Sequence, residues 1–269
     1  MLQTRTQIEP AIAPSRLRLY AGTSGWVHDS WRGPFYPASM PPAAYLQHYA
    51  QHFSAVELDS TFHVIPSPAT VATWNEYTPG HFTFTAKFPR IITYDKRLHD
   101  CETEVEHFLE VMSHLGPKLG PLVLQFDYSF QAEQQPILEA FLDRLPDDKC
   151  YAVEIRHRSW LNRSFFSMLQ ERSVALVLSD LHYMPRQDVA TTDWVYIRWL
   201  GTRDQVNGDY SKTVVDRQAD LSWWAQRVFW RLAEGREVFA FCNNHYAGHA
   251  PGTVRQFLEK LDKLYLPNK

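Results

Sequence analysis

Hydrophobic residues alternate with polar ones in eight short segments of the chain, and charged or amide side chains gather at the carboxyl end of most of them. The segments are 17–26, 55–62, 82–88, 121–127, 151–157, 175–180, 194–199 and 238–244. Side chains alternate between the two faces of a strand, so residues two apart share a face. The pattern predicts strands with one apolar face and one face that becomes polar at its end.

In five of these strands the two faces can be separated residue by residue. The apolar pairs are Val56/Leu58, Phe82/Phe84, Leu122/Leu124, Val153/Ile155 and Val195/Ile197, and the polar pairs are Glu57/Asp59, Thr85/Lys87, Gln125/Asp127, Glu154/Arg156 and Tyr196/Arg198. An apolar face covered by helices, with charges turned inward at one end, is typical of a parallel barrel. Its site is expected at the carboxyl ends of the strands.

Helical periodicity fills most of the intervals between the strands. The predicted helices are 42–53, 67–77, 102–115, 135–145, 162–171, 217–234 and 252–264. The interval 181–193 is too short and broken for a helix, so one crossover is expected to be degenerate. The sequence therefore predicts an α/β fold, a single (β/α)₈ TIM-like barrel with parallel strands. An open doubly wound sheet is the alternative. Eight near-equal units with inward polar ends favour a sheet that closes into a barrel.

The length of 269 residues suits one barrel domain. We expect a flexible N-terminal tail at 1–16 and a single TIM-like barrel domain at 17–269. The net charge of −3 gives no general attraction to nucleic acid, although it does not exclude a local basic patch.

The cysteines and the apolar segments bear on location. Cys101, Cys150 and Cys242 lack metal-binding or redox spacing, which favours reduced, buried thiols. No secretory signal pattern and no continuous apolar run of membrane-spanning length occurs in the sequence. We therefore expect a cytoplasmic protein without a membrane partner.

Cations at several strand ends suggest an anionic ligand. Arg156 and Arg198 suit a bidentate grip on carboxylate or phosphate, and Lys87 adds a point charge. The predicted substrate-binding residues are Trp26, Lys87, Gln125, Glu154, Arg156, Arg198, Asn243 and Asn244. The alternative is a self-neutralising ion network, in which Glu154 pairs with Arg156 or Lys87 and has no catalytic part.

Carboxylates and one histidine are candidates for proton transfer. Glu57, Asp59 or Asp180 could act as general base if burial or a second carboxylate raises its pKa. His157 is the first candidate among the histidines because it follows Arg156, and a structural hydrogen-bonding role is its alternative. The predicted catalytic residues are Glu57, Asp59, Asp180 and His157.

A metal site would draw on Glu57, Glu154, Asp180 and either His157 or His245. Several fixed cations in the same cavity would oppose a divalent ion, and the sequence has no H-E-x-x-H motif. We therefore expect no metal and no other cofactor.

Six motifs, in order, resemble the domain of unknown function 72 family over about residues 18–262. They are GTSGWVHDSWRGPFYP, VELDSTFHVIP, KLGPLVLQF, VEIRHRSW, LVLSD and NNHYAGHAP. The resemblance implies a TIM-barrel-like fold and no established reaction. The family's motif residues fall here on Gly22, Ser24, Gly25, Trp26, Glu57, Ser60, Thr61, Phe62, Arg156, His157, Trp160, Asp180, Arg198 and Asn244. This chain departs from the family with Asp59 in place of Asn and His63 in place of Tyr.

These observations predict a metal-independent enzyme that acts on a small phosphorylated or carboxylated molecule at the barrel mouth. One alternative is a nucleic-acid-binding or phosphodiester-processing protein that uses the same cations. A non-catalytic ligand-binding barrel is the other. The sequence leaves the reaction and the oligomeric state open.

Overall fold

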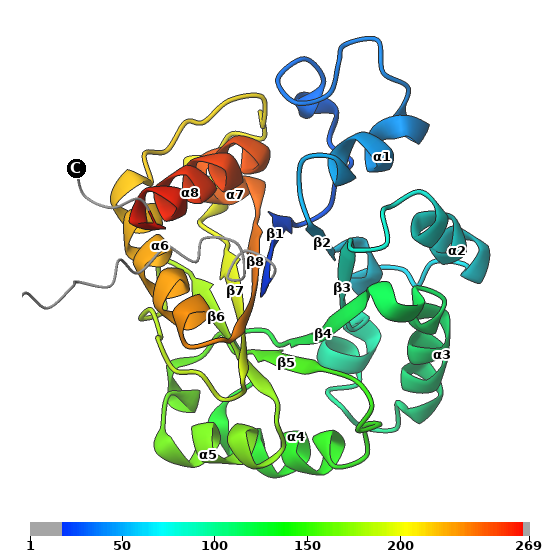
Figure 1. The fold of residues 1–269 in the computed structure, drawn as a ribbon. Helices are drawn as coiled ribbons and strands as arrows, with labels where there is room; N and C mark the ends of the chain where they lie inside the picture. The colour runs from blue at the N-terminus through cyan, green and yellow to red at the C-terminus, as the bar shows by residue number, and fades with distance from the viewer. Residues whose placement is uncertain (1–17, 266–269) are drawn as a thin grey trace, which may run out of the picture.

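The computed structural model describes residues 18–265, and the predicted tail at 1–16 lies outside the described residues. Eight parallel strands form one sheet in the order β1-β8-β7-β6-β5-β4-β3-β2, which curls into a nearly closed barrel (Figure 1). The strands are β1 (Leu19–Thr23), β2 (Ala55–Leu58), β3 (Thr83–Lys87), β4 (Leu119–Gln125), β5 (Tyr151–Glu154), β6 (Ala175–Asp180), β7 (Trp194–Trp199) and β8 (Glu237–Cys242). The predicted TIM-like barrel is confirmed.

Helices surround the barrel, and all except a short, unpredicted helix at 244–247 lie where the periodicity predicts them. They are α1 (Tyr45–Ala50), α2 (Pro68–Glu76), α3 (Glu102–Ser113), α4 (Gln135–Leu142), α5 (Arg163–Glu171), α6 (Gln218–Ala233), α7 (Asn244–Ala247) and α8 (Ala250–Tyr265). Within 18–265, no helix separates β6 from β7, so the degenerate crossover at 181–193 is confirmed. In the same described range, no helix has the length and apolar character needed to cross a membrane.

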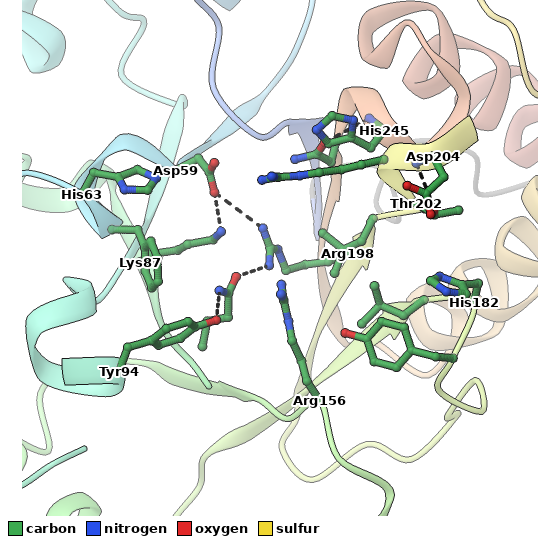
Figure 2. Close-up of a pocket in the computed structure, with 18 residues that line it drawn as sticks. Asp59, His63, Lys87, Tyr94, Arg156, His182, Arg198, Thr202, Asp204 and His245 are labelled. Atoms are coloured by element: carbon green, nitrogen blue, oxygen red, sulfur yellow. Dashed lines mark hydrogen bonds and ion pairs between the residues drawn. The ribbon is translucent and has the colours of Figure 1, made fainter. Parts of the chain in front are cut away.

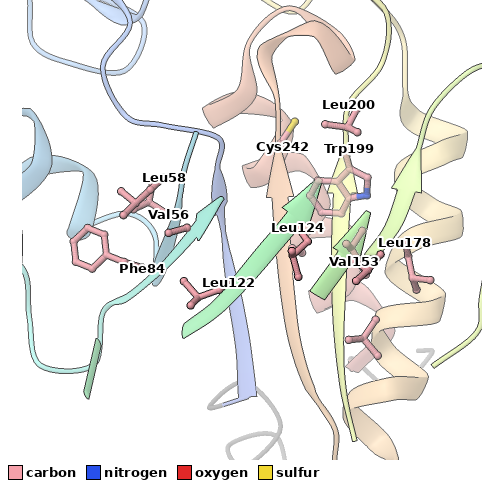
Figure 3. Packing of buried hydrophobic residues seen from close by; sticks show 14 of the residues in the cluster. Val56, Leu58, Phe84, Leu122, Leu124, Val153, Leu178, Trp199, Leu200 and Cys242 are labelled. Atoms are coloured by element: carbon pink, nitrogen blue, oxygen red, sulfur yellow. The ribbon is translucent and has the colours of Figure 1, made fainter. Parts of the chain in front are cut away.

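The two faces of the strands build two separate layers of the core. The outer layer packs strand residues such as Val56, Leu58 and Leu122 against the helices (Figure 3). The smaller inner layer fills the barrel with Ala55, Val123, Ala152, Ala175, Val177, Trp194, Tyr196, Phe239 and Phe241. Successive residues along a strand therefore belong in turn to the outer and the inner layer. Polar side chains follow the inner layer at the carboxyl ends of the strands.

The barrel closes where β1 meets β2, although these strands form the two ends of the hydrogen-bonded order. The Tyr49 hydroxyl joins them, because it accepts from the Thr23 N–H at 2.7 Å and donates to the Ala55 carbonyl at 3.1 Å. Gly22 permits this approach, since a Cβ there would lie 1.9 Å from the Ala55 carbonyl oxygen. At the mouth, the Gly25 N–H donates to the Glu57 carbonyl at 2.8 Å.

Candidate functional site

A cavity of about 510 Å³ opens at the carboxyl ends of the strands. Figure 2 shows charged side chains from opposite sides of the barrel converging there. The predicted site residues that line it are Asp59, Lys87, Gln125, Arg156, Arg198 and Asn243. Its other lining residues are Phe62, His63, Tyr94, Leu181, His182, Tyr183, Leu200, Gly201, Thr202, Arg203, Asp204 and His245.

Arg198 at the floor of the cavity is held between two fully buried carboxylates. One terminal nitrogen donates to Glu57 at 2.7 Å, and the other donates to Glu154 and, at 3.0 Å, to the Gln125 side-chain oxygen. Burial alone would lower the pKa of Arg198, but Glu154 and Glu57 raise it well above its usual value. The guanidinium is therefore a permanent cation committed to these partners.

Glu57 lies beneath the cavity rather than in its lining, and its carboxylate is satisfied there. It accepts from the Ser24 hydroxyl at 2.7 Å and from the Tyr196 hydroxyl at 2.8 Å, in addition to Arg198. The Tyr196 hydroxyl uses its hydrogen in the bond to Glu57, so the Thr85 hydroxyl donates to the Tyr196 oxygen at 2.7 Å. This arrangement fixes Glu57 as an acceptor inside the barrel and gives it no open path to a ligand.

Asp59 and Glu154 are held as carboxylates by their cationic neighbours. Burial raises the pKa of Asp59, but the Coulombic effect of Lys87 and Arg198 is stronger overall and lowers it to about 2. For Glu154, burial is again opposed by Arg198, Arg156 and Lys87, which lower the pKa to about 2. The expectation of a raised pKa at Asp59 is therefore wrong, because the sequence did not reveal how closely Lys87 pairs with it.

Arg156 keeps free donor capacity at this floor. Its Nε donates to Glu154 at 2.8 Å, and its side chain is 26% exposed. Within residues 18–265, its two terminal nitrogens have no hydrogen-bond partner, and Figure 2 shows the side chain reaching into the cavity. Two donors on one planar group can donate parallel hydrogen bonds to two oxygens of a carboxylate or phosphate.

Asp180 and Asn244 face away from the cavity. Asp180 lies on the outer side of β6, where it accepts from the Trp224 indole and the Tyr246 hydroxyl at 2.8 Å each and pairs with Arg186. The Asn244 oxygen accepts from the Trp31 indole and the Ala250 N–H at 3.1 Å each. Both side chains connect secondary-structure elements outside the barrel.

Trp26 and His157 also lie outside the lining. Trp26 is half-buried and meets Trp74 edge to face at 5.4 Å between ring centroids. The His157 Nδ1 lies 2.8 Å from the Ser159 hydroxyl and accepts from the Ser159 N–H at 3.2 Å, which caps a short helical turn. Of the predicted catalytic residues, the cavity therefore brings Asp59 alone to its surface.

The lining includes residues that the strand pattern does not single out. Tyr94 enters on a π-helical turn, Ile91–Asp95, after β3, and its hydroxyl accepts from Gln125 at 2.9 Å. Tyr183 comes from the helix-free crossover after β6, and Arg203 from the loop after β7. Their position in loops that follow strands is the available sequence signal, since such loops form barrel mouths.

His245 lines the cavity, although His157 is the histidine that the sequence places first for proton transfer. Burial lowers its pKa, with a smaller contribution from Arg203, so the imidazole is mostly uncharged near neutral pH. Its Nε2 lies 3.5 Å from the Tyr210 hydroxyl, and its buried Nδ1 has no partner in the described chain. A neutral imidazole at a cavity wall can accept a proton.

A metal centre finds no support among the described residues. Between residues 18 and 265, no three His, Cys, Asp or Glu side chains are grouped so that they could hold an ion. The predicted alternative ligands are separated by the barrel wall, because Asp180 faces outward while Glu57 and Glu154 face inward.

Comparison with known families identifies the chain's relatives. A family model described as "Protein of unknown function DUF72" matches residues 20–268. The chain belongs to the DUF72 family. The UPF0759 protein YecE of Escherichia coli is 36% identical over 139 residues, which are 52% of this chain and 48% of YecE. The match therefore spans about half the length of that relative. The UPF0759 protein YunF of Bacillus subtilis is 26% identical over 275 residues, covering 92% of this chain and 96% of YunF.

Solved structures of DUF72 proteins share the fold. A DUF72 protein of Thermotoga maritima aligns with a TM-score of 0.79 and 26% identity, covering 91% of this chain and 99% of its own. A DUF72 protein of Enterococcus faecalis aligns with a TM-score of 0.71 and 22% identity, covering 91% and 97%. The resemblance of the motifs to this family is thus confirmed, and so is the barrel that it implied.

Proposed function

We propose that this DUF72 protein binds a small phosphorylated or carboxylated molecule in the mouth cavity and transforms it without a resident metal. The observation that carries the proposal is Arg156, whose Nε is held by Glu154 while both terminal nitrogens are unpaired in the described chain. A guanidinium oriented by one carboxylate is preorganised to receive a second anion.

Selectivity for an anion would come from oriented donors rather than from net charge. The inner cations Lys87, Arg156 and Arg198 balance three inner carboxylates, so the floor is neutral before a ligand binds. Arg203 adds a cation at the cavity wall, and within residues 18–265 its side chain has no ion-pair or hydrogen-bond partner. The anion would thus accept hydrogen bonds from the two terminal nitrogens of Arg156 and be attracted by the charge of Arg203.

Proton transfer is assigned to His245 in this proposal. A pKa of about 2 makes Asp59 a weak base, whereas a His245 ring with a lowered pKa is free to accept a proton near neutral pH. Asp59 would instead keep the Lys87 ammonium oriented toward the ligand. Three free thiols, Cys101, Cys150 and Cys242, suit a reducing compartment, and we include the cytoplasm in the proposal.

The test is calorimetric titration of the protein with inorganic phosphate and, separately, with acetate. Arg156→Gln should weaken binding of the preferred anion about tenfold or more, because two charge-assisted hydrogen bonds are lost. The variant should fold, since Arg198 remains as the counter-ion of Glu154.

Arg163→Gln is the matched control, because Arg163 is exposed on α5 and has no ion pair within the described chain. It should bind the anion as the unmodified protein does. Equal binding by Arg156→Gln, or no binding of either anion by the unmodified protein at millimolar concentration, would overturn the proposal. Tight binding with no turnover in the unmodified protein would support a ligand-binding barrel instead of an enzyme.

A further inference from the structure

A second cavity, of about 620 Å³, lies beside the mouth cavity. It is lined by Tyr128, His157, Arg158, Tyr183 and Met184. Tyr183 lines both cavities, and the consecutive residues Arg156 and His157 line one cavity each. The two cavities therefore adjoin along Tyr183 and the end of β5.

Aromatic rings form much of this second cavity, and one of them is exposed. The Tyr128 side chain is 62% exposed, although large rings are normally packed. Its ring stands edge to face with His157, with 4.8 Å between centroids and 71° between the planes. One face of a Tyr128 ring held in this way remains available for a flat ligand group.

The surrounding side chains are fixed by hydrogen bonds to the chain. Arg158 donates to the Tyr183 carbonyl through Nε at 3.3 Å and through a terminal nitrogen at 3.1 Å. The Nδ1 of His157 accepts from the Ser159 N–H, so the proton of the neutral ring sits on Nε2. That Nε2 has no partner in residues 18–265 and is a donor for a ligand heteroatom.

The helix-free crossover explains why the second cavity exists. In the other barrel units a helix follows the strand-end loop, but 181–193 passes from β6 to β7 without one. Tyr183 and Met184 therefore remain at the mouth as a wall, with Tyr183 anchored to Arg158. The wall places an aromatic surface directly beside the donors of Arg156.

We propose that the second cavity is a subsite for a planar aryl or heteroaryl ring joined to the anionic group of the ligand. This inference rests on the proposed function, because the anion at Arg156 sets where the ring begins. The ring would lie against Tyr128 and Tyr183, and a heteroatom in a heteroaryl ring would accept a hydrogen bond from His157. The ligand class is thus an aromatic phosphate or carboxylate.

The experiment compares the binding of inorganic phosphate, cyclohexyl phosphate, phenyl phosphate and 2-phenylethyl phosphate by calorimetry. At least one aryl phosphate should bind about tenfold more tightly than inorganic phosphate and more tightly than cyclohexyl phosphate. The reason is that contacts between aromatic rings contribute more to the binding free energy than the buried area alone. Tyr128→Ala should remove this gain and leave the affinity for inorganic phosphate unchanged.

Tyr77→Ala is the matched control, since Tyr77 is an exposed tyrosine that lines neither cavity. Tyr77→Ala should keep the higher affinity for the aryl phosphate over inorganic phosphate. An equal affinity for inorganic and aryl phosphates, or a gain that survives in Tyr128→Ala, would overturn the subsite alone. Failure of every phosphate and of acetate to bind would overturn the subsite and its anion site together, whereas loss of all phosphate binding in Arg156→Gln with a ring gain in the unmodified protein supports both.

Discussion

At the scale of single residues, Arg198 is the charge on which the barrel floor depends. It contacts two carboxylates that are 0% exposed, and its own side chain is 1% exposed. The Coulomb attraction inside the barrel offsets a large desolvation cost only while all three charges are present. Arg198 is therefore a structural cation, and the proposed anion binding is assigned to Arg156 instead.

Replacement of Arg198 by methionine should destabilise the fold strongly. Arg198→Met leaves Glu57 and Glu154 buried without their common counter-ion, for an expected loss of about 3–5 kcal/mol in the free energy of unfolding. Urea denaturation at pH 7 measures this loss. Arg163→Met, at an exposed position, should change stability by less than about 0.5 kcal/mol.

A rescue experiment separates charge from packing at this position. Adding Glu57→Gln to Arg198→Met removes one of the uncompensated charges, so the double variant should be more stable than Arg198→Met alone. A double variant that is less stable than the single one would assign the loss to cavity formation rather than to charge.

The sequence carries part of this residue-level information. Alternation along the strands predicts correctly that Lys87, Gln125 and Arg198 point inward. The same rule applied to β6 puts Asp180 on the side of Leu176 and Leu178, which face the helices. The direction of the pKa shifts is not predictable in this way, because it depends on distances between side chains from different strands.

At the scale of secondary-structure elements, the junction of β1 and β2 is a close backbone contact of the barrel wall. A methyl group on Gly22 would lie 1.9 Å from the Ala55 carbonyl oxygen and 2.6 Å from the Tyr49 hydroxyl. The carbonyl belongs to the backbone of β2 and cannot move alone. The junction therefore requires glycine for its small size.

Gly22→Ala should lower the free energy of unfolding by about 2 kcal/mol or more, because the strands must separate to admit the methyl group. Differential scanning calorimetry would record this as a drop in Tm of several degrees. Gly80→Ala is the control, since a Cβ there meets nothing within 4 Å. Equal melting temperatures for the two variants would contradict the close approach.

Most elements are predictable from the sequence, whereas the walls of the cavity are not. The strands and the long helices follow from the periodicity of apolar residues. The missing helix at 181–193 follows from the lack of helical periodicity in that interval. The position of Tyr94 depends on a π-helical turn and on left-handed backbone at Arg97, Leu98 and Asp100. Such loop geometry is set by tertiary contacts, and no local pattern encodes it.

At the scale of the whole molecule, the inner ion network couples folding to pH. The pKa of Asp59 and that of Glu154 are both lowered to about 2 in the folded protein. An unfolded chain holds these carboxyl groups near their usual values of about 4. Between these values the unfolded state binds more protons than the folded state, so acid favours unfolding.

The free energy of unfolding should therefore be at its full value above about pH 5 and fall as the pH decreases toward about 2. Urea midpoints measured from pH 7 to pH 3 test this dependence. Asp59→Asn removes one of the two carboxyl groups with a lowered pKa, so the variant should lose less stability between pH 5 and pH 3 than the unmodified protein. Asp148→Asn, at an exposed carboxylate beside Lys149, should leave the dependence unchanged. An equal acid loss in Asp59→Asn and the unmodified protein would mean that Asp59 is not held as a carboxylate by Lys87 and Arg198.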